Sequence, residues 1–151
     1  MRALLLALSL IGLTAGSAMA DECGDLVEKV ASETGAKVDQ QRSDYASFTS
    51  GEDMTLTLAC SAPNFSSVGA QFRGASPPER YYALFGRAGH AVTGIDATTI
   101  TEAAHRAQET ATRMRHSNVD LGGARVTCSA MVSPDKGPLT LCAVIENSNR
   151  S

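Results

Sequence analysis

Four cysteines, Cys23, Cys60, Cys128 and Cys142, are the residues of this sequence best suited to chemistry. Structural zinc sites and thiol–disulfide centres generally use cysteine pairs of the C-x-x-C kind, and haem attachment adds a histidine to that pair. The closest two cysteines here, Cys128 and Cys142, lie in the segment CSAMVSPDKGPLTLC and are far more widely spaced. We therefore expect no metal, no redox centre and no cofactor, and we interpret the cysteines as structural.

Residues 1–20 have the three parts of a secretory signal. Arg2 supplies a positive charge, an apolar run follows from Ala3 to Leu13, and Ala18-Met19-Ala20 supplies a cleavage site. A membrane span needs about 20 apolar residues, and the run from Ala3 to Leu13 is shorter than that. We therefore predict a signal peptide over 1–20 and a single secreted domain over 21–151. We expect no membrane span after cleavage. The short positive region and the Ala-x-Ala end are typical of bacteria, which indicates a periplasmic or secreted location.

An even number of cysteines in an exported chain favours two disulfides. Four cysteines allow three pairings, and strand alternation helps to choose among them. If Val132 faces Leu139 across a hairpin turn, Cys128 and Cys142 point to opposite faces of the sheet and cannot be joined. The sequence then predicts the pairs Cys60 with Cys128 and Cys23 with Cys142, whereas a one-residue bulge would allow Cys128 to pair with Cys142.

The charge distribution argues against nucleic acid as a partner. The chain has a formal net charge of −3 and no cluster of basic residues, whereas binding to a phosphate backbone needs a basic face. The glycine motifs of nucleotide-binding folds and the serine motif of common hydrolases are also missing from the sequence.

The histidines and one aromatic segment are weaker candidates. The segment RYYALFGRAGH gathers Tyr82, Arg87 and His90, which we take as the candidate binding residues. The plainer interpretation is that its aromatic side chains are core and its arginines are solvated. His105 and His116 would lie about 16 Å apart on a predicted helix, too far for one metal ion, and we interpret both as surface residues.

Periodicity indicates the elements that position these residues. Apolar spacing predicts a helix over 24–34 and two more that begin at the capping boxes Ser76–Glu79 and Thr99–Glu102. Alternation predicts strands over 54–60 and 65–74, a hairpin around the turn 133–138, and a marginal strand within 37–48. The buried stripe of the third helix is predicted to comprise Ile100, Ala103, Ala104, Ala107, Ala111 and Met114.

This order predicts an α+β two-layer sandwich, in which three helices pack on an antiparallel sheet of about four to five strands. Two classes of function fit it. The first is a non-catalytic binding or envelope-associated module, with an unknown protein or envelope ligand as its partner. The alternative is a small periplasmic enzyme, such as a hydrolase, that uses scattered residues including His90. Because no catalytic constellation stands out, we favour the first; a deep pocket containing His90 and carboxylates would favour the second.

Overall fold

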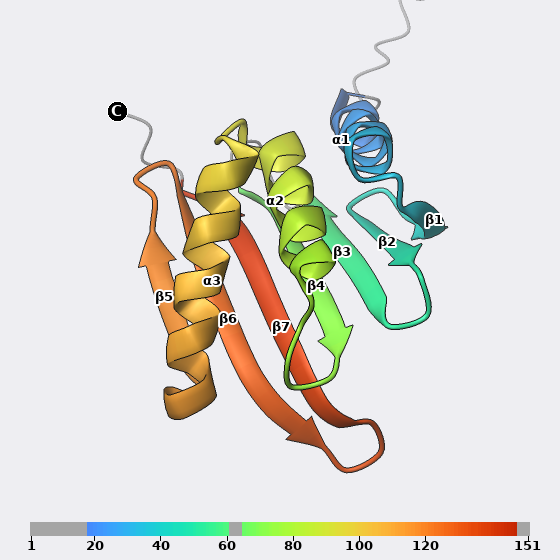
Figure 1. Cartoon of the computed structure of the whole chain (residues 1–151). Helices are drawn as coiled ribbons and strands as arrows, with labels where there is room; N and C mark the ends of the chain where they lie inside the picture. Colours follow the sequence, from blue (N-terminus) through green and yellow to red (C-terminus); the bar gives the residue numbers. More distant parts are fainter. Residues whose placement is uncertain (1–17, 61–64, 148–151) are drawn as a thin grey trace, which may run out of the picture.

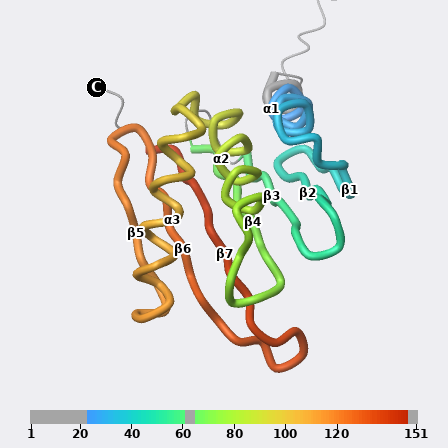
Figure 2. Tube along the Cα trace, in the orientation of Figure 1, coloured from blue at the N-terminus to red at the C-terminus, as the bar shows by residue number. Residues whose placement is uncertain are grey.

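The computed structural model, which describes residues 18–60 and 65–147, has one layer of helices against one antiparallel sheet (Figures 1 and 2). Seven strands pair in the order β1-β2-β3-β4-β7-β6-β5. The helices are α1 (Ala18–Thr34), α2 (Glu79–Thr93) and α3 (Ala97–Met114). The strands are β1 (Lys37–Gln41), β2 (Tyr45–Ser50), β3 (Met54–Cys60), β4 (Ser66–Arg73), β5 (His116–Asp120), β6 (Ala124–Ser133) and β7 (Gly137–Glu146). The predicted signal peptide lies largely outside the described residues.

The predicted α+β arrangement is confirmed, but the prediction of four to five strands was too low. The polar segment 37–48 contributes to two strands, β1 and β2, instead of one marginal strand. Strand β5 was not predicted at all, because its sequence HSNVD lacks an apolar alternation. Both β1 and β5 are edge strands with mostly exposed residues, so neither needs the pattern by which buried strands are recognised.

The core lies between the sheet and the helices. Helix α3 packs on β5 and β6, α2 packs on β4, and α1 lies beside α2. One face of each inner strand is apolar because successive side chains alternate between the two faces. From α2, Tyr81 is fully buried and its hydroxyl donates to the carbonyl oxygen of Ala70 over 2.9 Å. The largest fully buried side chains of the sheet are Phe48, Leu56, Leu58, Val68, Val126 and Val144.

Both predicted capping boxes are wrong. Helix α2 starts at Glu79 after Pro78, without a side-chain cap, because a residue that precedes a proline disfavours helical backbone and two successive prolines therefore delay the start. Helix α3 starts earlier than predicted, after Asp96. The carboxylate of Asp96 accepts from the amides of Thr98 (2.9 Å) and Thr99 (3.4 Å), and a negative charge at this helix end is favourable.

Two glycines allow α2 and α3 to pack closely. A Cβ on Gly86 would meet the hydroxyl of Thr101 and, at 2.6 Å, the carbonyl oxygen of Ala97. A Cβ on Gly89 would lie 2.9 Å from Ile100. The Thr101 hydroxyl donates to Ala97 over 2.8 Å within α3 and lies 3.3 Å from the carbonyl oxygen of Tyr82 in α2. Glycine at these positions therefore serves close helix packing, since α2 runs through both of them.

The two disulfides join Cys23 to Cys60 and Cys128 to Cys142, so both predicted pairs are wrong. The reason is the hairpin register. Val132 lies opposite Pro138 instead of Leu139, which puts Cys128 directly opposite Cys142 with their Cα atoms 4.1 Å apart. The two side chains then share a face, as a cross-strand bridge requires. Gly137, with a φ of +71°, adopts at the turn a conformation that side chains disfavour.

Candidate functional site

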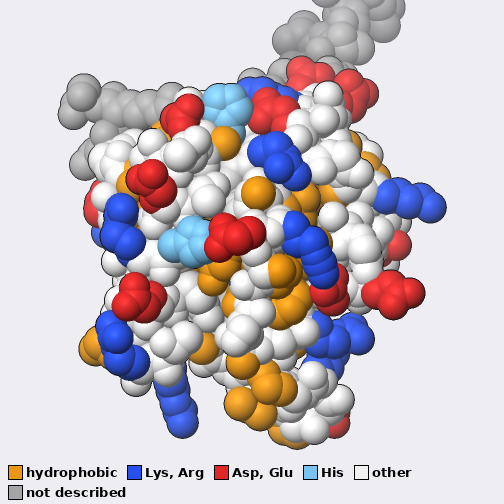
Figure 3. All heavy atoms as spheres, viewed as in Figure 1, with side chains coloured by type: hydrophobic (Ala, Val, Ile, Leu, Met, Phe, Trp, Pro, Cys, Tyr) orange, Lys and Arg blue, Asp and Glu red, His pale blue; other side chains and the backbone are white. Residues whose placement is uncertain are grey.

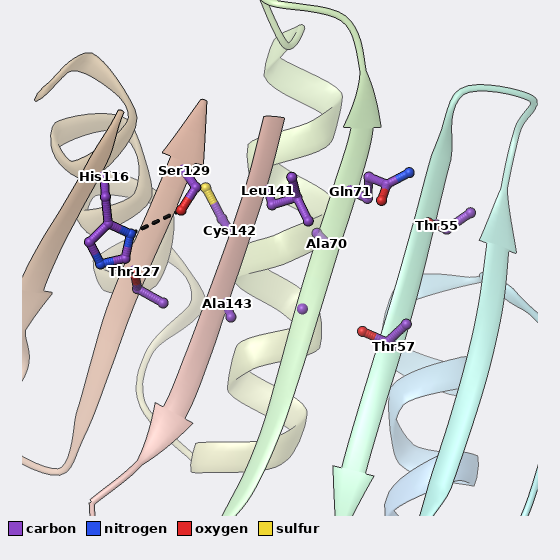
Figure 4. A pocket seen from close by; sticks show the side chains of 11 residues that line it. Thr55, Thr57, Ala70, Gln71, His116, Thr127, Ser129, Leu141, Cys142 and Ala143 are labelled. Atoms are coloured by element: carbon purple, nitrogen blue, oxygen red, sulfur yellow. Dashed lines mark hydrogen bonds between the residues drawn. The ribbon is translucent and has the colours of Figure 1, made fainter. Parts of the chain in front are cut away.

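The sheet has a second face that the helices do not cover, and its side chains align in rows across the strands. The register brings Thr55, Gln71, Leu141, Ser129 and His116 into one row that crosses β3, β4, β7, β6 and β5. These residues and their neighbours surround a cavity of about 390 Å³, which we call the open-face groove (Figure 4). Its lining residues are Thr55, Thr57, Gly69, Ala70, Gln71, His116, Thr127, Ser129, Leu141, Cys142 and Ala143.

Small residues in the next row make the floor of the groove. Thr57, Gly69, Ala143 and Thr127 lie opposite one another on β3, β4, β7 and β6. A Cβ built on Gly69 would be 3.2 Å from the Thr57 hydroxyl and 3.9 Å from the Ala143 Cβ. A larger side chain at Gly69 would therefore occupy part of the groove.

His116 is fixed at one end of the groove by two hydroxyls. Its Nδ1 lies 2.9 Å from the Ser129 Oγ, and its Nε2 lies 3.4 Å from the Thr127 Oγ1. Figure 4 shows the imidazole beside both side chains, with the bond to Ser129 drawn. A neutral imidazole has one donor and one acceptor nitrogen, and a hydroxyl can serve as either partner. Both tautomers of His116 are thus accommodated.

The lining of the groove contains no Asp, Glu, Lys or Arg, and His116 is its one histidine. Hydroxyls, an amide and an imidazole can form hydrogen bonds with a ligand. Leu141 and Ala143 form an apolar strip between the polar side chains of β4 and those of β6. A cavity of this size falls in the range that holds small ligands, about 300–1,000 Å³. The groove is therefore suited to an uncharged molecule that can form hydrogen bonds.

The pair of Ser129 and His116 has the contact expected of a nucleophile and its base. The groove lining supplies no carboxylate to orient the imidazole; Thr127 takes that place. Ser129 also lies in β6, which pairs on both sides, so the sheet uses the backbone amides that could stabilise an oxyanion. Gln71 is two strands away, or about 10 Å. The contact between Ser129 and His116 is thus present without a carboxylate in the groove lining.

The residues predicted as binding candidates lie on α2, in the helical layer. The His90 Nδ1 lies 2.9 Å from the carbonyl oxygen of Ile95, just beyond the end of the helix. Tyr82 is buried and stacks on His105 with 3.7 Å between ring centroids. Arg87 is exposed and lies five positions from Tyr82, or about 140° around the helix. Tyr82 and Arg87 thus lie on different sides of α2, and the binding role of Tyr82, Arg87 and His90 stays a prediction.

The tyrosines of α2 have shifted acidities. Burial raises the pKa of Tyr81, and a backbone hydrogen bond at Cys142 opposes that rise only in part. Burial and the nearby Glu79 carboxylate both raise the pKa of Tyr82. Both phenols are consequently protonated at neutral pH and behave as structural side chains.

The groove was missed because its residues are scattered in sequence. His116, predicted on a helix with His105, lies instead in β5. The alternation of Thr55 and Thr57 with core leucines gave one usable signal, since it placed two hydroxyls on the outward face. The row itself depends on the pairing of β4 with β7, strands that are far apart in the chain, and alternation within a strand carries no information about that pairing.

Comparison with protein families, with curated proteins and with solved structures gives no match for this chain. Within residues 18–60 and 65–147, no helix is long and apolar enough to cross a bilayer. Nor do three or more His, Cys, Asp or Glu side chains gather there in a way that could hold a metal ion.

Proposed function

We propose that this chain is an exported, disulfide-stabilised binding module that holds a small uncharged ligand in the open-face groove. The observation that carries the proposal is the row of uncharged, mostly polar side chains beside a floor of small residues. The groove has hydrogen-bonding side chains on both sides of Leu141 and Ala143, and a mostly apolar hollow with a few polar groups is typical of small-ligand sites. The proposed cellular location is a bacterial periplasm. We propose that residues 1–20 are cleaved and that residues 21–151 act as one domain.

The disulfides support the proposed compartment. Both bonds are of a kind that persists in oxidising environments such as the periplasm and is rare in the cytosol. The Cys128–Cys142 bond links β6, which carries Thr127 and Ser129, to β7, which carries Leu141 and Ala143. The covalent bond therefore limits relative movement of the two strands that contribute most to one side of the groove.

Titration with uncharged probes tests the proposal. The probes are neutral N-acetylglucosamine oligomers and peptides blocked at both ends, with free-carboxylate peptides as the charged comparison, and backbone amide shifts report binding. We expect neutral probes to shift amides of β4, β6 and β7. Ala143→Trp, which fills the floor, should abolish those shifts. Thr49→Trp, exposed on β2 outside the groove lining, is the matched control. Equal binding by the two variants would contradict the proposed site.

The hydrogen bond between His116 and Ser129 favours a second candidate function, a serine hydrolase acting on a neutral ester. The Ser129 hydroxyl would attack the ester carbonyl while His116 takes its proton; the alcohol would leave with that proton, and water would then release the acid from Ser129. A fluorophosphonate probe distinguishes the two candidates. A hydrolase would be labelled on Ser129, with loss of label in Ser129→Ala and in His116→Ala, whereas the binding module we propose would not be labelled.

A further inference from the structure

The β6–β7 hairpin extends past the end of the neighbouring strand β5 (Figure 1). It carries exposed apolar side chains. Val132 is 77% exposed and Met131 is 53% exposed. We define the hairpin patch as Met131, Val132 and Pro138. The patch borders a cavity of about 700 Å³ that Ala75 and Ala130 also line. Figure 3 shows hydrophobic side chains gathered at this end of the molecule.

The hairpin patch is apolar on both faces of the sheet. Successive strand residues point to opposite faces, so Val132 shares the inner face with Cys128 while Met131 shares the outer face with Ser129. Helix α3 ends at Met114 and leaves Val132 uncovered. Both side chains also line the same cavity. A fluid lipid interface would surround the hairpin tip and cover them together.

Cationic side chains lie on each side of the patch. Arg73 pairs across the sheet with Leu139, which is itself opposite Met131. Arg115 lines the cavity from the end of α3, and Lys136 lies in the hairpin turn. None of these three cations forms an ion pair within the described part of the chain. The turn also contains one carboxylate, Asp135.

The charge near the hairpin tip determines how the hairpin patch interacts with a charged surface, even though the whole chain has a net charge of −3. At physiological salt, charges separated by more than about 8 Å are largely screened. Only the groups near the tip therefore act on an apposed surface. Exposed apolar side chains flanked by basic residues are the combination that binds an anionic membrane interface.

We propose that the hairpin patch inserts into the interface of an anionic lipid bilayer. Met131, Val132 and Pro138 enter the boundary between headgroups and acyl chains, while Arg73, Arg115 and Lys136 contact lipid phosphates. This is peripheral binding by a loop and involves no membrane span. It places the open-face groove near a membrane surface, but it does not depend on what that groove binds.

Fluorescence and vesicle sedimentation test the insertion. Because the chain contains no Trp, Met131→Trp introduces a single reporter, and Ile145→Trp is the matched control at the other end of the sheet, where Ile145 is 41% exposed. The protein is isolated from the periplasm of an expressing bacterium and its amino terminus is verified by mass spectrometry, since residues 3–13 would themselves enter lipid. The vesicles contain phosphatidylglycerol and phosphatidylethanolamine, with phosphatidylcholine alone as the neutral comparison.

We expect the Met131→Trp emission to shift to the blue with the anionic vesicles and the Ile145→Trp emission to stay unchanged. Val132→Asp should lower the partition coefficient about tenfold or more, and Arg73→Gln or Lys136→Gln about fivefold each. Ile145→Asp should bind like the parent protein. Equal binding of Val132→Asp and the parent, or equal binding to neutral vesicles, would overturn the proposal. So would reversible self-association that Val132→Asp abolishes when vesicle binding is absent, because the patch would then be a contact between copies.

Discussion

Substituting Gly86 by alanine tests how closely α2 and α3 pack. In an exposed helix the change would stabilise by about 1 kcal/mol. Here the new Cβ would meet the carbonyl oxygen of Ala97 at 2.6 Å, and a backbone atom cannot rotate away. Overpacking of this kind costs about 1–3 kcal/mol, and a backbone obstacle puts Gly86→Ala at the upper end. We therefore expect a net loss of about 2 kcal/mol, which lowers the Tm by roughly 4–8 °C in a chain of this size.

Two other glycines provide matched comparisons. Gly24 lies within α1 with no atom near its Cβ position, so Gly24→Ala should raise the Tm by about 2–4 °C. The neighbours of Gly89 are the ends of the Ile100 and Val144 side chains, at 2.9 and 3.0 Å. Because such atoms can move, Gly89→Ala should rank between the parent and Gly86→Ala.

Thermal and urea denaturation of the three oxidised variants gives the ranking directly. The urea transition should keep its slope, because the substitutions alter stability and leave the extent of unfolding unchanged. A Gly86→Ala variant as stable as Gly24→Ala would show that α2 and α3 do not approach closely enough at Gly86 for its Cβ to meet the Ala97 carbonyl. Adding Thr101→Ala to Gly86→Ala should recover only part of the loss, since the Ala97 carbonyl remains in place.

Three further outcomes are expected. Replacing Cys128 and Cys142 together by alanine should lower the free energy of unfolding by about 3 kcal/mol, because the bond closes a loop in the unfolded chain. Non-reducing peptide mapping of the parent protein should recover the Cys128–Cys142 pair. A peptide that joins either residue to another cysteine would contradict the hairpin register. The free energy of unfolding should fall as pH rises above about 10, because burial raises the pKa of Tyr81 in the folded chain and the unfolded chain ionises first. Tyr81→Phe should flatten that fall in urea titrations and, through the lost bond to Ala70, cost about 1 kcal/mol at neutral pH; an unaltered pH dependence would exclude Tyr81 as its cause. His90→Ala should lower stability by about 1 kcal/mol and leave groove binding intact, whereas loss of binding at unchanged Tm would make His90 a functional residue.

The sequence predicted those elements whose signal is local. The alternation of Met54, Leu56 and Leu58 and the spacing of Tyr81 and Phe85 each report one buried face, and the structure confirms both. The same logic failed at the end of α3. Met114 continues the helical spacing but is 71% exposed, at the last residue of α3.

Features that depend on register or on distant pairing could not be predicted. The disulfide pairs follow from a turn in which Val132 faces Pro138, and a shift of one residue reverses which cysteines share a face. The groove requires His116 to lie opposite Ser129, which in turn requires that a polar segment be a strand. Periodicity in a sequence reports which residues are buried. Paired residues on an exposed sheet face, such as His116 and Ser129, therefore produce no periodic pattern.

The strand order divides the chain into two parts with different demands on folding. Strands β1–β4 form a meander of near neighbours whose strand β3 is joined to α1 by the Cys23–Cys60 bond, and β5–β7 form another that contains the Cys128–Cys142 bond. The two meanders join only where β4 pairs with β7, as in Ser67 opposite Ile145. Closing such a long loop is entropically expensive and slow. The groove takes its walls from both parts, so it requires the pairing of β4 with β7.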